Sequence, residues 1–348
     1  MIRECIPLLL ENHELTPDQA KATMKEIMSG EATSSQVAAF LIGLKKKRET
    51  ADEVAALAQV MREFGRRIHP KISGYLLDTC GTGGDRTKTF NVSTTAAFVI
   101  AAAGVPVAKH GNRSFTSKCG SADVLEQLGL NLNMEAALVE RAIEEIGIGF
   151  MFAPNFHPAM KNVASVRREI GVRTVFNILG PLTNPAGANA QLIGVYDSEL
   201  LEPMCLAAHN LGAKSVMTVY GLDGVDEISM TGKTIIVRRQ HGGVFRDEVE
   251  PEDLGFRRST AEEIAGSDPE ENARLTAKIL SGRLGRNDPR VQIVLANAAG
   301  LVLCERAENF REGVEIASQV VSDGKPFRTL YQLVEFSGGD THRLKNLA

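Results

Sequence analysis

Three segments rich in glycine and polar side chains are the parts of this sequence best suited to chemistry on a phosphate group. Residues 81–85 (GTGGD) follow the apolar run 75–80 directly, and glycines at such a turn let backbone N–H groups approach a phosphate closely. Residues 91–94 (NVST) begin a helical pattern, where unpaired N–H groups and the helix dipole favour an anion. Residues 109–117 (KHGNRSFTS) again lie between a strand-like run and a helix start. Each segment could be an ordinary turn or cap, but together they predict an anion site at the carboxyl ends of parallel strands.

The spacing around the first segment excludes two common nucleotide-binding motifs. Thr87 rather than glycine precedes Lys88, so the segment is not a P-loop. Arg86 occupies the position of the last glycine in G-x-G-x-x-G, so the segment does not match that motif either. Residues 78–120 contain five basic and two acidic side chains, a net charge of +3, whereas the whole chain carries −4. A basic pocket on an acidic protein indicates a small polyanionic ligand and argues against nucleic acid as a partner.

A pair of adjacent carboxylates, Asp226 and Glu227, follows an apolar run that ends near Tyr220. A solvated turn is the ordinary interpretation of such a pair. Carboxylates are also the hard oxygen ligands that Mg²⁺ prefers, and Mg²⁺ is commonly shared between protein carboxylates and substrate phosphates. Because the basic segments predict a phosphorylated ligand, we expect Mg²⁺ as the cofactor.

Arg167 occupies an unusual position in a predicted helix that follows His157 and Pro158. It lies seven residues after Met160 and four after Val163, so it shares a helix face with apolar side chains. A cation on an apolar face requires a partner, because an unpaired buried charge is costly. The partner could be an internal carboxylate or the carboxylate of a substrate.

The elements that must position these residues divide the chain in two. Capping boxes at Thr16 and Thr50, each with a glutamine or glutamate three residues later, predict two of three short helices in the first 65 residues. From residue 75 onward, short apolar runs alternate with helical patterns, which predicts an α/β fold with a mostly parallel sheet. We therefore expect a small all-helical domain over 1–70 and a larger α/β domain over 74–345. Residues 228–230 and 234–238 predict a hairpin.

Composition supports an ordinary globular protein. The 348 residues are 43% apolar and 24% charged, and no apolar run reaches the ~20 residues that span a membrane. The N-terminus lacks the apolar core of a signal peptide, and the five cysteines contain no C-x-x-C pair. We expect a cytoplasmic protein with no membrane partner.

Five motifs, in this order and spacing, closely resemble the anthranilate phosphoribosyltransferase family over nearly the whole chain. They are residues 81–85, 89–94, 109–113, 166–177 (with VRR at its start and RTVFN at its end) and 223–227 (DGVDE). The resemblance implies an enzyme of tryptophan biosynthesis, which transfers the phosphoribosyl group of phosphoribosyl pyrophosphate to the amine of anthranilate and releases pyrophosphate. It also implies a helical segment around 160–190 that returns to the helical domain, and a homodimer.

The resemblance further implies the roles of individual residues. Phosphoribosyl pyrophosphate would be held by Gly81, Gly84, Asp85, Thr89, Asn91, Val92, Ser93, Thr94, Lys109, His110, Gly111, Asn112, Arg113, Ser117 and Ser121. Anthranilate would be held by Gly81, Asn112 and Arg167, and Mg²⁺ by Ser93, Asp226 and Glu227. The sequence departs from the family's usual pattern at Phe115, Thr116, Cys119 and Tyr220.

Two alternatives compete with this interpretation. A nucleoside phosphorylase of related architecture would attack ribose with phosphate and would not require the carboxylate pair. A noncatalytic, nucleic-acid-binding relative would be expected to lose that pair and to gain positive charge. We expect the homodimer to form through the helical domain, because its apolar residues exceed what three short helices need to cover: Met24, Ile27, Met28, Phe40 and Leu44.

Overall fold

The computed structural model describes residues 1–84, 89–114 and 118–348. Two of the predicted site residues, Asp85 and Ser117, lie outside the described residues, as do the basic residues Arg86 and Lys88. No helix in the described ranges is long and apolar enough to cross a membrane.

The N-terminal part of the chain is a helical domain, as predicted. Its helices are α1 (Ile2–Leu10), α2 (Pro17–Ser29), α3 (Ser34–Lys47) and α4 (Ala51–Glu63). Both predicted capping boxes are present: the Thr16 and Thr50 hydroxyls accept the N–H groups three residues later at 3.2 and 3.3 Å. These caps satisfy N–H groups that would otherwise be unpaired at the start of α2 and α4.

The apolar side chains of this domain fill its interior. Each of the five residues invoked for a dimer interface is at most 2% exposed: Met24, Ile27, Met28, Phe40 and Leu44. The surface argument for a dimer is therefore wrong, because the short helices enclose these side chains. The reason lies partly in a later helix, α9 (Lys161–Ile170), whose Val163 and Val166 belong to the same core.

A seven-stranded sheet forms the centre of the α/β domain. In spatial order it contains β3 (Ile148–Phe152), β2 (Val107–Gly111), β1 (Leu77–Gly81), β4 (Ala190–Gly194), β5 (Ser215–Gly221), β6 (Thr234–Gln240) and β7 (Gly243–Val249). The first five are parallel, and β6 and β7 add an antiparallel edge. The mostly parallel sheet expected from the sequence is confirmed.

The predicted hairpin within residues 228–238 is wrong. Residues 228–230 form no strand, and the hairpin instead joins β6 to β7, with Thr234 opposite Val249. A buried side chain explains the difference: the Asn297 amide accepts the Ile228 N–H at 2.8 Å and donates to the Ile228 carbonyl at 3.0 Å. With both backbone groups of Ile228 satisfied by Asn297, this segment has no need of a strand partner.

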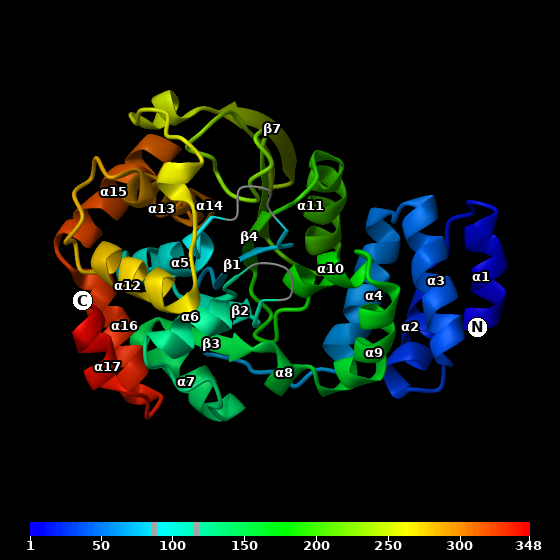
Figure 1. Ribbon diagram of the computed structural model, residues 1–348. Helices are drawn as coiled ribbons and strands as arrows, with labels where there is room; N and C mark the ends of the chain where they lie inside the picture. The colour runs from blue at the N-terminus through cyan, green and yellow to red at the C-terminus, as the bar shows by residue number, and fades with distance from the viewer. Residues whose placement is uncertain (85–88, 115–117) are drawn as a thin grey trace.

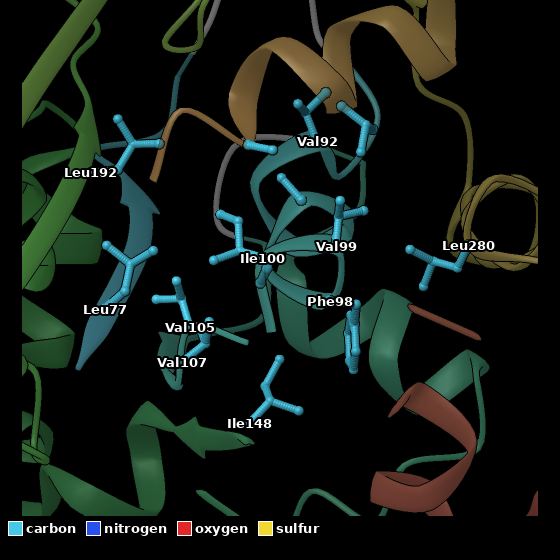
Figure 2. Close-up of a cluster of buried hydrophobic side chains, with 14 of the residues drawn as sticks. Leu77, Val92, Phe98, Val99, Ile100, Val105, Val107, Ile148, Leu192 and Leu280 are labelled. Carbon is cyan, nitrogen blue, oxygen red and sulfur yellow. The ribbon is translucent and has the colours of Figure 1, made fainter. Parts of the chain in front are cut away.

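Helix α5 (Val92–Ala102) is the central element beside the sheet, and nearly all of its side chains are buried. Figure 2 shows Phe98, Val99 and Ile100 of this helix among side chains from several strands, with Leu280 of a later helix nearby. Such all-round burial rigidly fixes the position of the first turn of α5. That turn contains the predicted residues Val92, Ser93 and Thr94.

The remaining helices surround this core. They are α6 (Ser121–Gln127), α7 (Ala136–Ile146), α8 (Ala153–Phe156), α10 (Phe176–Leu179), α11 (Leu201–Asn210), α12 (Pro269–Leu280), α13 (Pro289–Asn297), α14 (Gly300–Leu303), α15 (Phe310–Ser322), α16 (Lys325–Phe336) and α17 (Thr341–Leu347). Figure 1 shows α12 to α17 gathered at one end of the molecule, and α9 beside α1 to α4 at the other. Helices α9 and α10 contact α2, α3 and α4, so the chain returns to the helical domain after β3.

Candidate active site

A cleft of about 340 Å³ lies between the carboxyl ends of the parallel strands and the wall formed by α9 and α10. Every predicted site residue within the described ranges lines it: Gly81, Gly84, Thr89, Asn91, Val92, Ser93, Thr94, Lys109, His110, Gly111, Asn112, Arg113, Ser121, Arg167, Asp226 and Glu227. The structure thus brings together residues that are up to 146 positions apart, Gly81 and Glu227. The binding roles of these residues stay predictions.

The first loop leaves β1 at Gly81 and is tied down by backbone contacts. The Thr82 N–H donates to the Gly194 carbonyl at 2.9 Å, and the Gly83 N–H donates to Asp226 Oδ2 at 3.1 Å. Gly194 is required here because a Cβ at this position would collide with the backbone carbonyl of Asp226. The ends of β1 and β4, at Gly81 and Gly194, therefore leave space for the loop that contains Asp226.

The first turn of α5 presents its N–H groups to the same space. The Ser93 N–H donates to Glu227 Oε1 at 3.1 Å. One of the N–H groups that favour an anion at this helix start is therefore already bonded to a carboxylate. The Asn91 side chain is held from both sides, since it donates to the Cys119 carbonyl at 3.2 Å and accepts from Asn272 at 3.2 Å. Asn91 thereby couples the start of α5 to the start of the α6 region.

Two predicted phosphate ligands engage protein groups in this structure. Lys109 is 3% exposed, and its ammonium donates to the Thr79 carbonyl at 2.6 Å. Arg113 forms ion pairs with Asp123 at 3.0 Å and Glu126 at 2.8 Å, which raise its pKa further. Both side chains line the cleft, but to contact a phosphate they would have to leave or share these partners.

Two buried side chains of opposite charge, Asp78 and Lys109, lie close enough below the cleft to affect each other's pKa. Complete burial raises the pKa of Asp78 to about 6 and lowers the pKa of Lys109, and the opposite charge of each partner counteracts the shift of the other. The Asp78 carboxylate accepts the His110 N–H at 3.3 Å, so it also holds the end of β2. Asp78 was not predicted as a site residue, and its strand position alone does not show that it faces Lys109.

Two buried histidines, His110 of the cleft lining and His157, lie against each other with their rings tilted by 60°. The rings of His110 and His157 are 5.1 Å apart, and burial lowers their pKa values to about 3 and about 4. Both rings are therefore neutral at pH 7. The Nε2 atom of each has no hydrogen-bond partner among the described residues. His110 can offer or accept a hydrogen bond in the cleft, but it cannot supply a proton as an imidazolium.

The carboxylate pair lies in a well-braced loop after β5. Asp223 accepts the Ser229 hydroxyl at 2.6 Å and also the Thr231 hydroxyl, while Asn297 holds Ile228 from the other side. Asp226 and Glu227 thus reach the cleft from a rigid support. Among the described residues, no group of three or more histidine, cysteine, aspartate or glutamate side chains could hold a metal. Two carboxylates that line the same cleft as Ser93 suit Mg²⁺, whose coordination is commonly completed by substrate oxygens and water.

Arg167 faces the strand-end loops across the cleft. It is half-buried, its guanidinium lies 5.3 Å from the centre of the Phe176 ring, and burial lowers its pKa. Within the ranges 1–84, 89–114 and 118–348 its guanidinium forms no ion pair or hydrogen bond, whereas its neighbour Arg168 is exposed. The internal carboxylate considered from the sequence is thus absent from the described part of the chain. A desolvated guanidinium is open to a substrate carboxylate.

Several lining residues were not assigned roles from the sequence: Cys80, Thr82, Gly83, Phe90, Ser114, Cys119, Gly120, Phe176 and Asn177. Phe176 and Asn177 belong to the motif at residues 166–177, and membership of this motif is the only sequence feature that points to them. Cys119 is buried, which raises its thiol pKa to about 11, so this departure from the usual pattern places a neutral thiol at the cleft. Arg173 supports the site from outside by donating to the Gly84 carbonyl at 3.0 Å.

Comparison with known proteins assigns both parts of the chain. Residues 3–65 match the helical bundle domain of a glycosyl transferase family, and residues 73–327 match its α/β domain. The anthranilate phosphoribosyltransferase of Symbiobacterium thermophilum is 52% identical over 96% of each chain. That of Methanocorpusculum labreanum is 48% identical over 97% of this chain and 99% of its own.

Solved structures agree with these relatives. The Thermus thermophilus anthranilate phosphoribosyltransferase superposes with a TM-score of 0.89 at 41% identity, covering 96% of this chain and 99% of the other. The Saccharomyces cerevisiae enzyme, solved with phosphoribosyl pyrophosphate and Mg, gives a TM-score of 0.89 at 28% identity, covering 97% and 98%. The strand-end loops, the carboxylate pair and the full-length similarity lead to one conclusion: this chain belongs to the anthranilate phosphoribosyltransferase family.

Proposed function

We propose that the cleft between the strand-end loops and α9 is the place where this enzyme joins its two substrates. The activity is that of the family: transfer of the phosphoribosyl group of phosphoribosyl pyrophosphate to the amine of anthranilate, in tryptophan biosynthesis. The products are N-(5-phosphoribosyl)anthranilate and pyrophosphate. The observation that carries the assignment is the arrangement of one cleft, in which the Asp226–Glu227 pair and the anion-binding loops face the open guanidinium of Arg167.

The donor would lie against the strand-end loops. Backbone N–H groups of the first loop and of the first turn of α5 suit its phosphates, and residues 109–113 supply the basic side chains of the second loop. Asn112 and Ser121 bring further polar groups, with the Ser121 hydroxyl donating to the Asn112 carbonyl at 3.3 Å. We assign Asp85 and Ser117 to the donor from the family resemblance alone.

Magnesium would be held by Asp226, Glu227 and Ser93, which all line the cleft. The related yeast enzyme was solved with phosphoribosyl pyrophosphate and Mg, which supports this cofactor. When bound, the ion supplies positive charge that stabilises a departing pyrophosphate. The Gly83 and Ser93 N–H groups already hold the two carboxylates on the cleft side.

The protein's own part in the reaction is mainly to bind and to orient. The amine of anthranilate is uncharged at neutral pH, so its nitrogen attacks the ribose carbon without prior loss of a proton. The new C–N bond forms as the C–O bond to pyrophosphate breaks, and the nitrogen then releases a proton. Arg167, Asn112 and the backbone of Gly81 would align the acceptor, while the basic loops balance the charge that develops on the leaving group.

The deciding experiment is a fluorescence assay of anthranilate consumption in the presence of phosphoribosyl pyrophosphate and Mg²⁺. We expect turnover that requires all three components. Absence of turnover with correctly folded protein would overturn the assignment of the cleft and of the activity together.

The assembly and location remain proposals. A homodimer through the helical domain is supported by Leu10 and Ile42, which are 56% and 44% exposed on α1 and α3. Sedimentation would decide it, since a monomer at micromolar concentration contradicts the proposal. All five cysteines are free thiols, which suits the reducing cytoplasm proposed from the sequence.

The division of the chain into a helical domain, residues 1–70 with a returning segment around 160–190, and an α/β domain, residues 74–345, is likewise proposed. It is supported by side chains of the returning segment, among them Val163 and Leu179, which pack in the same core as α1 to α4.

A further inference from the structure

A small basic cavity of about 100 Å³ lies outside the cleft, where the end of α4 and the connection after it meet residues 183–187. Its charged or titratable lining residues are Arg62, Arg66, Arg67, His69 and His157. No carboxylate lines this cavity within the described part of the chain.

Two of the arginines are held in place by backbone carbonyls. Arg62 donates from Nε to the Leu182 carbonyl at 2.7 Å and from Nη1 to the Leu211 carbonyl at 3.0 Å. Arg67 donates from Nε to the Arg62 carbonyl at 3.2 Å. These bonds leave Nη2 of Arg62 and both terminal nitrogens of Arg67 without a hydrogen bond to any described residue. A guanidinium fixed in this way is preorganised for a planar or tetrahedral anion.

The Asp78 carboxylate offsets part of the positive charge on Arg62, because it acts to raise the pKa of this arginine, but no direct ion pair between described residues neutralises the cavity. None of Arg62, Arg66 and Arg67 forms an ion pair with a described residue. Burial and the neighbouring charge of Arg67 lower the pKa of Arg62 to about 10. Solvation alone can account for the exposed Arg66 and Arg67, but Arg62 is partly withdrawn from water, where an unpaired cation is costly.

We propose that this cavity is a second anion site, which takes a single phosphate-sized oxyanion: inorganic phosphate or one end of the pyrophosphate product. Its volume corresponds to roughly three water molecules at about 30 Å³ each, which leaves no room for a sugar phosphate. The oxyanion accepts from the free guanidinium nitrogens of Arg62 and Arg67, with Arg66 at the entrance.

The basic cavity adjoins the cleft through two histidine rings that contact each other. His157 lines the basic cavity, and its ring lies 5.1 Å from that of His110, which lines the cleft. A Cβ on Gly65 would lie 3.1 Å from His157 Nδ1, so the segment that follows α4 packs directly against this ring. An anion in the cavity favours the protonated form of His157 and therefore raises its pKa above the present value of about 4.

The test must separate this site from the cleft, which itself binds phosphate groups under the proposed function. We suggest equilibrium dialysis of radiolabelled orthophosphate with the cleft filled by excess unlabelled phosphoribosyl pyrophosphate and Mg²⁺. We expect one saturable phosphate per chain. The double variant Arg66→Gln/Arg67→Gln should weaken it by about tenfold or more, because charge-assisted hydrogen bonds are lost. The control Arg3→Gln/Arg168→Gln, which removes two exposed arginines elsewhere, should bind as the unaltered enzyme does.

Competition identifies the oxyanion. Unlabelled pyrophosphate or phosphate should displace the label, whereas benzoate, a carboxylate of the acceptor's size, should not. Independently, the NMR titration of His157 should shift to higher pH on phosphate addition in the unaltered enzyme and not in the double variant. The proposal is overturned if no saturable binding remains with the cleft filled, if Arg66→Gln/Arg67→Gln binds normally, or if benzoate competes better than phosphate. Loss of catalytic turnover alone would bear on the cleft and not on this site.

Discussion

The strand-end wall of the cleft offers an anion many backbone N–H groups and several side chains, whereas the opposite wall offers the single guanidinium of Arg167. On the strand-end side, Gly83 and Ser93 already donate to Asp226 and Glu227, so binding is shared among several elements. On the α9 side, no described residue shares the charge of Arg167. The two walls therefore suit different ligands: a flexible polyanion with several phosphates, and a rigid molecule with one carboxylate.

This difference determines how sensitive each wall is to mutation. Loss of one contact among many leaves the others in place, so a single substitution in the loops should weaken the donor only modestly. Loss of Arg167 removes the only cation that the described residues of that wall offer to the acceptor. The exception on the donor side is the carboxylate pair, because Asp226 and Glu227 are the only acidic side chains among the described residues that line the cleft.

The largest effect should follow from replacing both carboxylates, Asp226→Ala/Glu227→Ala. We expect turnover to fall on the order of 10³-fold or more while the protein stays folded, because charge on the departing pyrophosphate would no longer be balanced. Activity across a magnesium titration, together with thermal melting, measures this. The matched control is Asp247→Ala/Glu248→Ala, an adjacent exposed pair on β7. Full activity in the first double variant would remove these residues from the metal site.

The next effect concerns Arg167→Ala. Removing one partner of a desolvated charge pair costs roughly 2 to 5 kcal/mol, so kcat/KM for anthranilate should fall by about 30-fold or more. The KM for phosphoribosyl pyrophosphate should change little, which separates the two walls. Lysine should restore only part of the loss, because it lacks the two parallel hydrogen bonds. Arg168→Ala is the control, and unchanged anthranilate kinetics in Arg167→Ala would leave this arginine with a structural role only.

A smaller effect is expected from Gly84→Ala in the donor loop. Gly84 has φ +90°, and a Cβ there would collide with the guanidinium of Arg173. A left-handed backbone costs a non-glycine residue roughly 1–2 kcal/mol, so the KM for phosphoribosyl pyrophosphate should rise about tenfold. Gly74→Ala has a similar φ of +84° with open space around it, and it should affect stability without affecting KM. Equal KM values in the two variants would mean that the loop conformation is unimportant for the donor.

The smallest effect concerns pH and the groups beneath the two walls. The folded pKa of His157 is about 4, below its ordinary 6.5, so its stabilising contribution is present above pH 6.5 and is lost as pH falls toward 4. His110 acts in the same direction down to about pH 3. Asp78 acts oppositely, because its folded pKa of about 6 favours the folded state as pH falls from 6 toward 3.8.

The contribution of His157 can be isolated by difference. Between pH 6 and 4.5, His157→Asn should flatten the slope of unfolding free energy against pH by at most about 1.4 kcal/mol per pH unit. Urea denaturation at a series of pH values measures the slope, and His13→Asn, which replaces an exposed histidine, is the control. An unaltered slope in His157→Asn would show that this histidine is not buried as a neutral ring.

Much of the architecture could be predicted from local patterns. The capping boxes at Thr16 and Thr50 specify helix starts because donor and acceptor lie within four residues of each other. The glycine-rich segments could be placed at strand ends because turn geometry and apolar periodicity are also local properties. The failed hairpin at residues 228–230 shows the limit, since its backbone partner is Asn297, about 70 positions away in the sequence.

The sequence by itself therefore determined the helical domain, the α/β class, the segments that form the cleft and the face on which Arg167 lies. Only the tertiary structure decided how individual side chains are paired. Lys109 turns to a carbonyl of β1, Arg113 to the carboxylates of α6, and His157 comes to lie against His110. The physical reason is that periodicity and caps depend on neighbours within one turn or strand. Desolvation and charge pairing depend on whichever distant elements the packed core brings together.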